Sequence, residues 1–205
     1  PSCVGLVLWG LETTRTHGET YAQVMALIGV RRARARRPGQ PGWEVIPTTE
    51  LSGSRVDVVV TISGFFRDLF GTLVEELDDM FAAVAALDEP AEINPIAART
   101  RATHDRLIAD GMTKSQAREL SHVRVFGPPP ELYATGLTDV IDTGNWVTTA
   151  ELAEHFTHGA QHVYSRHRHG ERVSGLYRRH LADVELVAQC RSSNEHHITD
   201  LDHFF

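Results

Sequence analysis

The sequence is poor in cysteine and lacks any long hydrophobic run. Cys3 and Cys190 are the two cysteines among 205 residues, which is too few for a disulfide framework or a zinc finger. No apolar stretch approaches the roughly 20 residues of a membrane span, and no secretory leader opens the chain. We therefore expect a cytoplasmic protein with reduced thiols and without a membrane span.

Two nucleotide-binding motifs are also absent. The segment LWGLETTRTHGE, residues 8–19, follows an apolar run but matches neither the G-x-G-x-x-G fingerprint of dinucleotide-binding proteins nor the P-loop pattern. The formal net charge of −7 is unlike that of nucleic-acid-binding proteins, which are usually basic. The sequence thus predicts neither nucleotide hydrolysis by this chain nor a nucleic-acid partner.

Histidine, in contrast, is abundant. The chain has 12 histidines, and most of them lie in its last quarter. The hydrophobic fraction of 41% and the charged fraction of 23% are otherwise those of an ordinary globular protein. The sequence begins without Met, almost directly on an apolar run, and stops at Phe204 and Phe205 inside an apparent helix. We expect it to be a fragment of a larger subunit.

The order of apolar and amphipathic stretches predicts an α/β fold. Strands are expected at residues 4–9, 44–47, 55–62 and 123–126, and helices at 16–30, at 69–87 and, in two pieces broken at Gly111, at 95–121. Strands that alternate with helices imply right-handed crossovers and a parallel sheet. We expect a Rossmann-like, mostly parallel sheet of about four strands flanked by helices over residues 1–127. Residues 128–205 are expected to form a helical and loop extension that packs on the rim of this sheet.

Polar side chains follow three of the expected strands. They lie in residues 10–19, 63–68 and 127–136. In open parallel sheets, ligands bind beyond the carboxyl ends of the strands. We therefore expect these three segments to converge on one cleft.

The first segment has two interpretations. In the structural one, Thr14 or Thr16 caps a helix, and Glu19 is stabilised by the positive end of the helix dipole. In the functional one, a carboxylate such as Glu12 or Glu19 and the imidazole of His17 remove protons or pass on a divalent cation. The spacing alone does not choose between them.

The second segment contains the pair Arg67 and Asp68 one turn into a helix. Such a pair is usually a local ion pair. At the rim of a sheet, however, Arg67 can also bind an anionic group such as a ligand carboxylate. The arginine run at residues 31–37 is likewise open to two interpretations, a solvated loop or a docking surface for an acidic partner.

The histidines of the last quarter raise the question of a metal site. Those at positions 155, 158 and 162 have helical spacing, but Gly159 interrupts that helix and no cysteine accompanies them, so we expect solvated histidines rather than a dedicated site. Further on, Glu195, His196 and Asp202 form a denser cluster. This cluster is either a helix cap or a weak, exchangeable cation site.

Taken together, the motifs identify a family resemblance. LWGLETTRTHGETYAQVMALIGV, EVIPTTEL, RVDVVVTISGFFRDLF, RVFGPPPELYATGL with GNW, and CRSSNEHHITDLDHFF occur in this order over nearly the whole chain. In this order they resemble the C-terminal part of the large subunit of cobaltochelatase, whose close relative is the large subunit of magnesium chelatase.

The resemblance implies a multisubunit, ATP-dependent ligase that forms nitrogen–metal bonds in a tetrapyrrole. The large subunit binds the macrocycle, whereas two AAA+ partner subunits, and not this chain, bind and hydrolyse ATP. The implied substrates are Co2+ and hydrogenobyrinic acid a,c-diamide, or alternatively Mg2+ and protoporphyrin IX. A non-catalytic, chelatase-like module that binds a tetrapyrrole or metal is the competing hypothesis, and the fragment alone is expected to be inactive.

Site residues follow from the matching motifs. The resemblance and the chemistry imply His17 and Glu19 as catalytic groups, because pyrrole protons must be removed when a metal enters the ring. The implied substrate-binding residues are Arg15, Ser63, Arg67, Asp68, Tyr133, Trp146 and Arg191. The implied weak and transient metal ligands are Glu195, His196 and Asp202.

Overall fold

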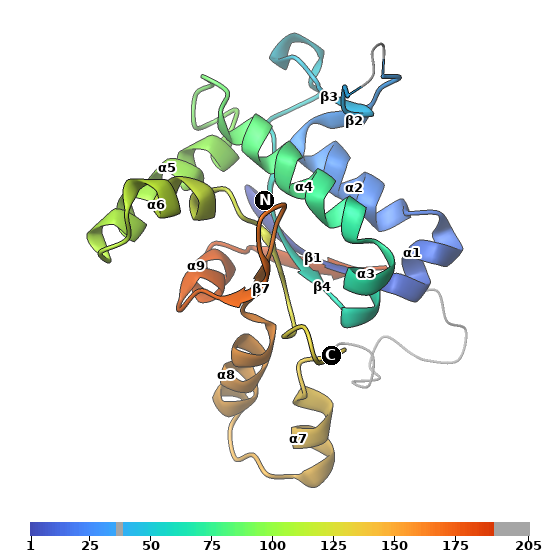
Figure 1. Ribbon diagram of the computed structural model, residues 1–205, viewed down its shortest axis with the longest axis vertical. Coiled ribbons are helices and arrows are strands. Elements are labelled where there is room, and N and C mark those ends of the chain that lie inside the picture. The colour runs from blue at the N-terminus through green and yellow to red at the C-terminus, as the bar shows by residue number, and fades with distance from the viewer. Residues whose placement is uncertain (36–38, 191–205) are drawn as a thin grey trace.

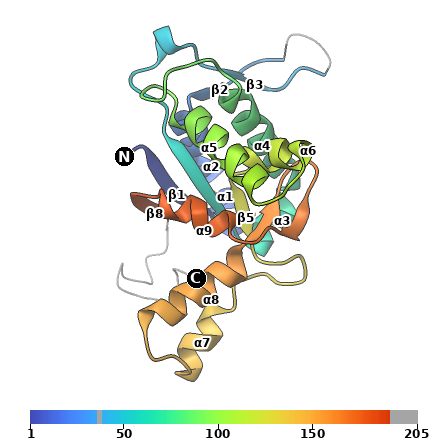
Figure 2. The same ribbon diagram turned by 90° about the vertical axis from the view of Figure 1, so that its left-hand side faces the viewer.

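The computed structural model describes residues 1–35 and 39–190 of the chain. A six-stranded sheet with the order β7-β6-β5-β4-β1-β8 lies between helices (Figures 1 and 2), and β2 and β3 form a separate two-stranded sheet. The strands are β1 (Cys3–Leu8), β2 (Val30–Arg32), β3 (Trp43–Val45), β4 (Asp57–Ile62), β5 (Val125–Gly127), β6 (His162–Tyr164), β7 (His169–Arg172) and β8 (Leu186–Gln189). The helices are α1 (Gly10–Thr16), α2 (Glu19–Ile28), the 3-10 turn η1 (Thr48–Glu50), α3 (Gly64–Leu69), α4 (Gly71–Ala85), α5 (Pro95–Ala109), α6 (Lys114–Ser121), α7 (Leu137–Thr143), α8 (Thr149–Ala160) and α9 (Leu176–Ala182).

The predicted α/β class with a mostly parallel sheet is confirmed. Strand β1 is parallel to both β4 and β8, and β4 is parallel to β5. The remaining strands, β6 and β7, run antiparallel at one edge of the sheet. The carboxyl ends of β1, β4 and β5 therefore lie at the same edge.

The number and position of the short strands differ from the expectation. Residues 43–45 do not join the main sheet but pair with β2, where they are only partly buried. Strands β6, β7 and β8 lie in the stretch expected to contain helices and loops. They have three or four residues each, and β7 carries mainly exposed polar side chains, so periodicity gives little signal. The division of the chain at residue 127 stays a prediction.

Helices cover both faces of the sheet. On one face, alternate residues of β1 and β4, such as Leu6 and Val60, pack against α2 and α4. On the other face, Val59 and Phe126 belong to a second apolar cluster with residues of α5, α6, α8 and α9. The uninterrupted apolar runs of β1 and β4 follow from this burial on both sides. None of the described helices is long and apolar enough to cross a membrane.

Two buried ion pairs fix the amino edge of the sheet. The Arg55 guanidinium donates to both carboxylate oxygens of Glu89, at 2.8 and 2.9 Å. Arg124 donates to both carboxylate oxygens of Asp57, at 2.9 and 3.2 Å, and neither side chain of this pair is more than 1% exposed. Both guanidinium groups also donate to backbone carbonyls, so their desolvation is compensated.

Replacing Arg124 by Met leaves the Asp57 carboxylate buried without its counter-charge. We expect Arg124→Met to lower the free energy of unfolding by about 3–5 kcal/mol, as measured by urea denaturation. The control is Arg106→Met, because the Arg106–Asp110 pair is largely exposed and should contribute less than about 1 kcal/mol. Similar losses for the two variants would contradict the role given to the buried pair.

Candidate functional site at the carboxyl edge of the sheet

The three polar segments meet at the carboxyl edge, as the topology predicts. The backbone N–H of Ser63, just after β4, donates to the carbonyl of Leu8 at the end of β1, at 3.2 Å. The next N–H, that of Gly64, donates to the carbonyl of Tyr133 in the loop after β5, at 2.9 Å. The start of α3 is thus hydrogen-bonded to both neighbouring segments.

Two glycines make this close approach possible. A Cβ at Gly64 would lie 2.5 Å from the Cα of Tyr133, and a Cβ at Gly10 would lie 2.6 Å from the ring of Phe65. Real Cβ atoms do not approach other atoms so closely. Any larger residue at either position would therefore push the segments apart.

A small cavity of about 40 Å³ lies where the segments join. This volume holds one or two water molecules but no large ligand. The residues around it are Val7, Trp9, Thr61, Ile62, Ser63, Pro128, Tyr133, Ala134, Thr135 and Phe156. We call this space the rim cavity.

Large apolar side chains remain exposed on the segments that form this rim. Leu11 is 73% exposed, Phe65 44%, Leu132 49% and Tyr133 62%. Single exposed apolar residues are common on protein surfaces, whereas several of them on three adjoining segments make this rim a candidate contact surface for an apolar partner. The rim cavity itself is too small to receive such a partner, so an apolar partner would have to lie across the surface of the rim.

Arg67 holds the loop after β5 in place. One nitrogen of its guanidinium donates to the carbonyls of Pro129 and Leu132, both at 3.1 Å, and Nε donates to Asp68 at 2.7 Å. The guanidinium also lies over the ring of Tyr133, 5.9 Å from its centre. The Arg67 guanidinium lowers the pKa of the exposed Asp68 carboxyl. In this arrangement Arg67 positions Tyr133.

Ser63 has a structural partner of its own. Its hydroxyl accepts a hydrogen bond from the N–H of Phe66 at 3.1 Å and so caps α3. Ser63 also lines the rim cavity. The structure therefore brings together four of the predicted substrate-binding residues, which are Ser63, Arg67, Asp68 and Tyr133.

The first segment folds into two short helices joined by a tight turn. His17, with φ of 57°, and Gly18, with φ of 87°, both adopt the left-handed conformation that reverses the chain between α1 and α2. His17, Arg15 and Glu19 are exposed. The Thr16 hydroxyl accepts a hydrogen bond from the N–H of Glu19 at 3.1 Å. Thr16 is the last residue of α1, however, and the N-cap position of α2 is Gly18, so the predicted N-cap at Thr14 or Thr16 is wrong. Glu19 has an exposed side chain.

Glu12 was one possible carboxylate of the first segment but was not among the predicted site residues. It is 7% exposed, and its Oε1 accepts hydrogen bonds from the hydroxyls of Thr16 at 3.0 Å and Thr20 at 3.1 Å. Its Oε2 is buried and finds no partner within the described residues. Thr16, four residues after Glu12, lies on the same side of α1, and this spacing was the signal for the first contact. Thr20 belongs to α2 and reaches Glu12 across the turn, which the spacing does not predict. Glu12 fixes the turn that presents His17 and Glu19.

Other predicted site residues lie elsewhere. Trp146, 37% exposed, belongs to the linker between α7 and α8, and Figure 1 shows this linker at the end of the two helices that points away from the sheet. The structure thus does not bring it to the rim. Arg191, Glu195, His196 and Asp202 lie outside the described residues.

The histidines that the structure describes do not gather into a metal site. Across residues 1–35 and 39–190, no group of three or more His, Cys, Asp or Glu side chains is arranged to hold a metal ion. His155 and His158 are exposed on α8. The weak cation site expected at the end of the chain cannot be placed, because its residues lie beyond position 190.

His180 on α9 is buried against the sheet. It is 4% exposed, its ring lies 5.6 Å from that of Phe126, and its Nε2 has no hydrogen-bond partner among the described residues. Burial, and then the charges of Arg124 and other arginines, hold the pKa of His180 well below its usual range. One turn earlier, the Tyr177 hydroxyl lies 2.8 Å from that of Thr61, which lines the rim cavity. Tyr177, rather than His180, thus links α9 to the rim cavity.

Comparison with known proteins shows the family of this chain. A family model described as CobN/Magnesium Chelatase matches residues 1–205. The chain belongs to this family. Relatives include the aerobic cobaltochelatase subunit CobN of Pseudomonas aeruginosa, 35% identical over 98% of the chain, and a magnesium-chelatase subunit of Chlorobaculum parvum, 32% identical over the whole chain. The chain spans 16% of the length of each of these relatives.

The fold matches a solved member of the CobN/magnesium chelatase family. The catalytic subunit of cobaltochelatase from Mycobacterium tuberculosis superimposes with a TM-score of 0.81 at 34% identity. The match covers 92% of this chain and 16% of that subunit. The resemblance expected from the motifs is therefore confirmed.

Burial of neutral His180 predicts a pH-dependent stability. Below a pH of about 6.5 the unfolded chain binds a proton at His180 that the folded chain does not. As the pH falls below 6.5, this residue alone should lower the free energy of unfolding by about 1.4 kcal/mol per pH unit. Above that pH, His180 adds no pH dependence to the stability.

We expect His180→Leu to flatten the pH dependence below 6.5 by this amount, as measured by urea denaturation at several pH values. His155→Leu, which removes an exposed histidine from α8, serves as the control and should leave the slope nearly unchanged. An identical slope for His180→Leu and the unmodified chain would show that His180 is not neutral in the folded protein.

Proposed function

We propose that this chain contributes one wall of the tetrapyrrole site of an ATP-dependent metal chelatase that inserts Co2+. The observation that carries the proposal is the set of exposed apolar side chains on the three segments of the rim, next to a cavity that is too small for a ligand. A flat macrocycle that lies across Phe65 and Tyr133 would cover this apolar surface. The opposite side of the ring would then contact other parts of a longer subunit.

The side chains around the turn of α1 and α2 suit the chemistry of insertion. A metal ion can enter the ring after it loses its water and after two pyrrole N–H groups lose their protons. His17 and Glu19 are exposed at the turn between these helices and can accept such protons. Arg15, also exposed there, can bind a carboxylate arm of the macrocycle. The rigid base beneath them is the hydrogen-bonded cluster of Glu12.

Membership of the family supports a choice of partners and of metal. The described segments contain no phosphate-binding loop, so ATP would be hydrolysed by AAA+ partner subunits and not by this chain. Co2+ is the proposed metal and hydrogenobyrinic acid a,c-diamide the proposed ring, supported by the 35% and 36% identity of the chain to two aerobic cobaltochelatase subunits CobN. Insertion of Mg2+ into protoporphyrin IX is the second candidate, supported by the 32% identity to the Chlorobaculum parvum magnesium-chelatase relative over the whole chain.

The apolar rim can be tested by ring binding. In the native-length protein, Phe65→Ser combined with Tyr133→Ser should weaken tetrapyrrole binding about tenfold, since two aromatic contacts are lost. Binding is followed by the change of Soret-region absorbance on titration with a corrin and with a porphyrin. The control is Leu186→Ser, which removes a similarly exposed apolar side chain from β8. Equal affinities of the double variant and the control would leave the rim without a role in ring binding.

Catalysis is tested separately from binding. With the AAA+ partners and ATP present, Glu19→Gln should lower the rate of metal insertion by about 100-fold or more, as expected for a lost general base, while the dissociation constant of the ring changes less than about twofold. Glu151→Gln is the matched control, because Glu151 also lies in the first turn of a helix, α8. If both variants insert metal at the normal rate, Glu19 is a helix-terminal residue and no more.

The same assay decides between the candidate functions. Insertion of Co2+ into the corrin precursor, of Mg2+ into protoporphyrin IX, or of neither metal is measured with the native-length protein and its partners. Ring binding without insertion of either metal would favour the non-catalytic module over the chelatase.

A further inference from the structure

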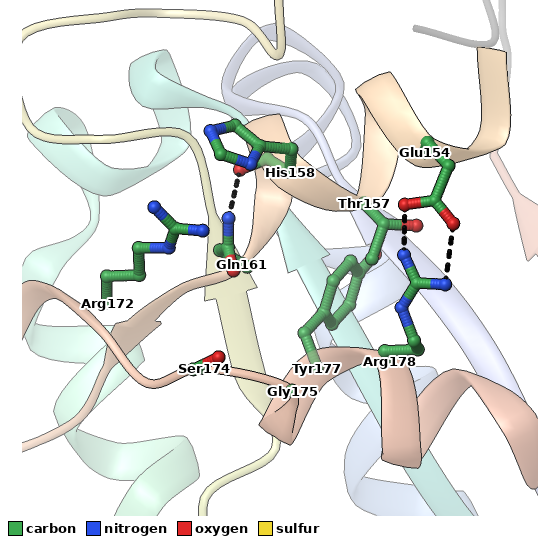
Figure 3. A pocket seen from close by; sticks show the side chains of 9 residues that line it. All are labelled: Glu154, Thr157, His158, Gln161, Arg172, Ser174, Gly175, Tyr177 and Arg178. Carbon is green, nitrogen blue, oxygen red and sulfur yellow. Dashed lines mark hydrogen bonds and ion pairs between the residues drawn. The ribbon is translucent and has the colours of Figure 1, made fainter. Parts of the chain in front are cut away.

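A second, larger pocket lies behind the candidate site. It has a volume of about 240 Å³ and is formed by the end of α8, by β7 and by the turn into α9 (Figure 3). Its lining residues are Glu154, Thr157, His158, Gln161, Arg172, Ser174, Gly175, Tyr177 and Arg178. None of them lines the rim cavity. We call this space the α8–α9 pocket.

Tyr177 lies between the α8–α9 pocket and the rim cavity. Its ring faces the α8–α9 pocket, whereas its hydroxyl bonds Thr61 of the rim cavity at 2.8 Å. Burial raises the pKa of Tyr177 to about 12, so this hydroxyl stays protonated at neutral pH. An occupant of the α8–α9 pocket would therefore be separate from a ring on the rim.

The charges of the α8–α9 pocket do not cancel. Arg178 donates to both carboxylate oxygens of Glu154, one of them at 2.7 Å, so this pair is neutral overall. The guanidinium of Arg172, in contrast, forms neither an ion pair nor a side-chain hydrogen bond with any residue that the structure describes. One positive charge is thus left in the pocket, and a guanidinium in such a position favours a carboxylate or phosphate oxygen.

Polar groups that can complete an anion site surround Arg172. Figure 3 shows the Arg172 guanidinium, the Ser174 hydroxyl and the His158 ring around the space beside Gln161. The Ser174 hydroxyl and the His158 ring lack hydrogen-bond partners within the described part of the chain. Gln161 is 8% exposed, and its amide nitrogen donates to the carbonyl of His158 at 2.8 Å, which holds the end of α8 in shape.

The backbone fixes the relative positions of these groups. Arg172 pairs with His162 in the antiparallel ladder of β6 and β7, so it lies beside the residue that follows Gln161. Gly175, with φ of 72°, reverses the chain between Ser174 and α9. Strand and helix ends, rather than a long loop, therefore hold the arginine, the glutamine and the serine.

We infer that the α8–α9 pocket binds an oxyanion, a carboxylate or phosphate group of a small polar molecule, with Arg172 as its principal contact. Arg172 donates to two oxygens of the anion, and Ser174 and His158 complete the contacts. The volume of the α8–α9 pocket lies below the roughly 300–1,000 Å³ that is usual for sites of drug-sized ligands. The occupant is thus a small acid or a single charged arm.

The inference is tested by calorimetric titration of the native-length protein with inorganic phosphate and, separately, with succinate at matched ionic strength. We expect saturable binding of at least one of them, and the tighter of the two distinguishes a phosphate from a carboxylate group. Arg172→Gln should weaken that binding at least about tenfold, the loss expected for charge-assisted hydrogen bonds. Arg172→Lys, which keeps the charge but not the fork of donors, should bind with intermediate affinity.

Arg101→Gln is the matched control, because it removes one positive charge from an exposed position on α5. It should bind like the unmodified protein. Arg172 is exposed on β7, so its variants should fold, which circular dichroism verifies. The inference fails if neither ion binds saturably, if Arg172→Gln binds normally, or if the two Gln variants lose the same affinity.

Discussion

The contact between the start of α3 and the loop after β5 is the constraint on which the candidate site depends. The N–H of Gly64 bonds the carbonyl of Tyr133 at 2.9 Å, and no Cβ fits at position 64. Arg67 reinforces the contact through two further carbonyls of that loop. Because Ser63 is bonded to the end of β1 in the same way, three segments that are distant in sequence form one continuous rim.

The two edges of the sheet differ in the kind of side chains that they bury and expose. At the amino edge, Arg55 and Arg124 are fully buried and bonded to carboxylates and carbonyls, which favours one arrangement of the strands. At the carboxyl edge, apolar side chains remain exposed, and the polar side chains of Arg67, Ser63 and Glu12 hold the loops and turns in place. The amino edge is thus fixed by buried ion pairs, whereas the carboxyl edge leaves several apolar side chains exposed.

The sequence predicted the long elements and the convergence of the three segments, but not their detailed contacts. The strands expected at 4–9 and 55–62 have continuous apolar runs, and the structure places β1 and β4 there. The short strands β6 to β8 depend on hydrogen bonds to neighbours rather than on a pattern of their own. Besides its neighbour Asp68, Arg67 bonds two backbone carbonyls more than 60 positions away, and periodicity contains no information about such distant contacts. The burial of Glu12 likewise follows from the fold of α1 against α2.

The most direct test of the continuous rim is hydrogen exchange of the native-length protein, measured by mass spectrometry with and without a bound tetrapyrrole. The account predicts that the ring slows exchange in residues 10–19, 63–68 and 128–136 together, while residues 43–46 at the amino edge exchange at an unchanged rate. Protection of a single segment, or of none of the three, would contradict a shared tetrapyrrole surface.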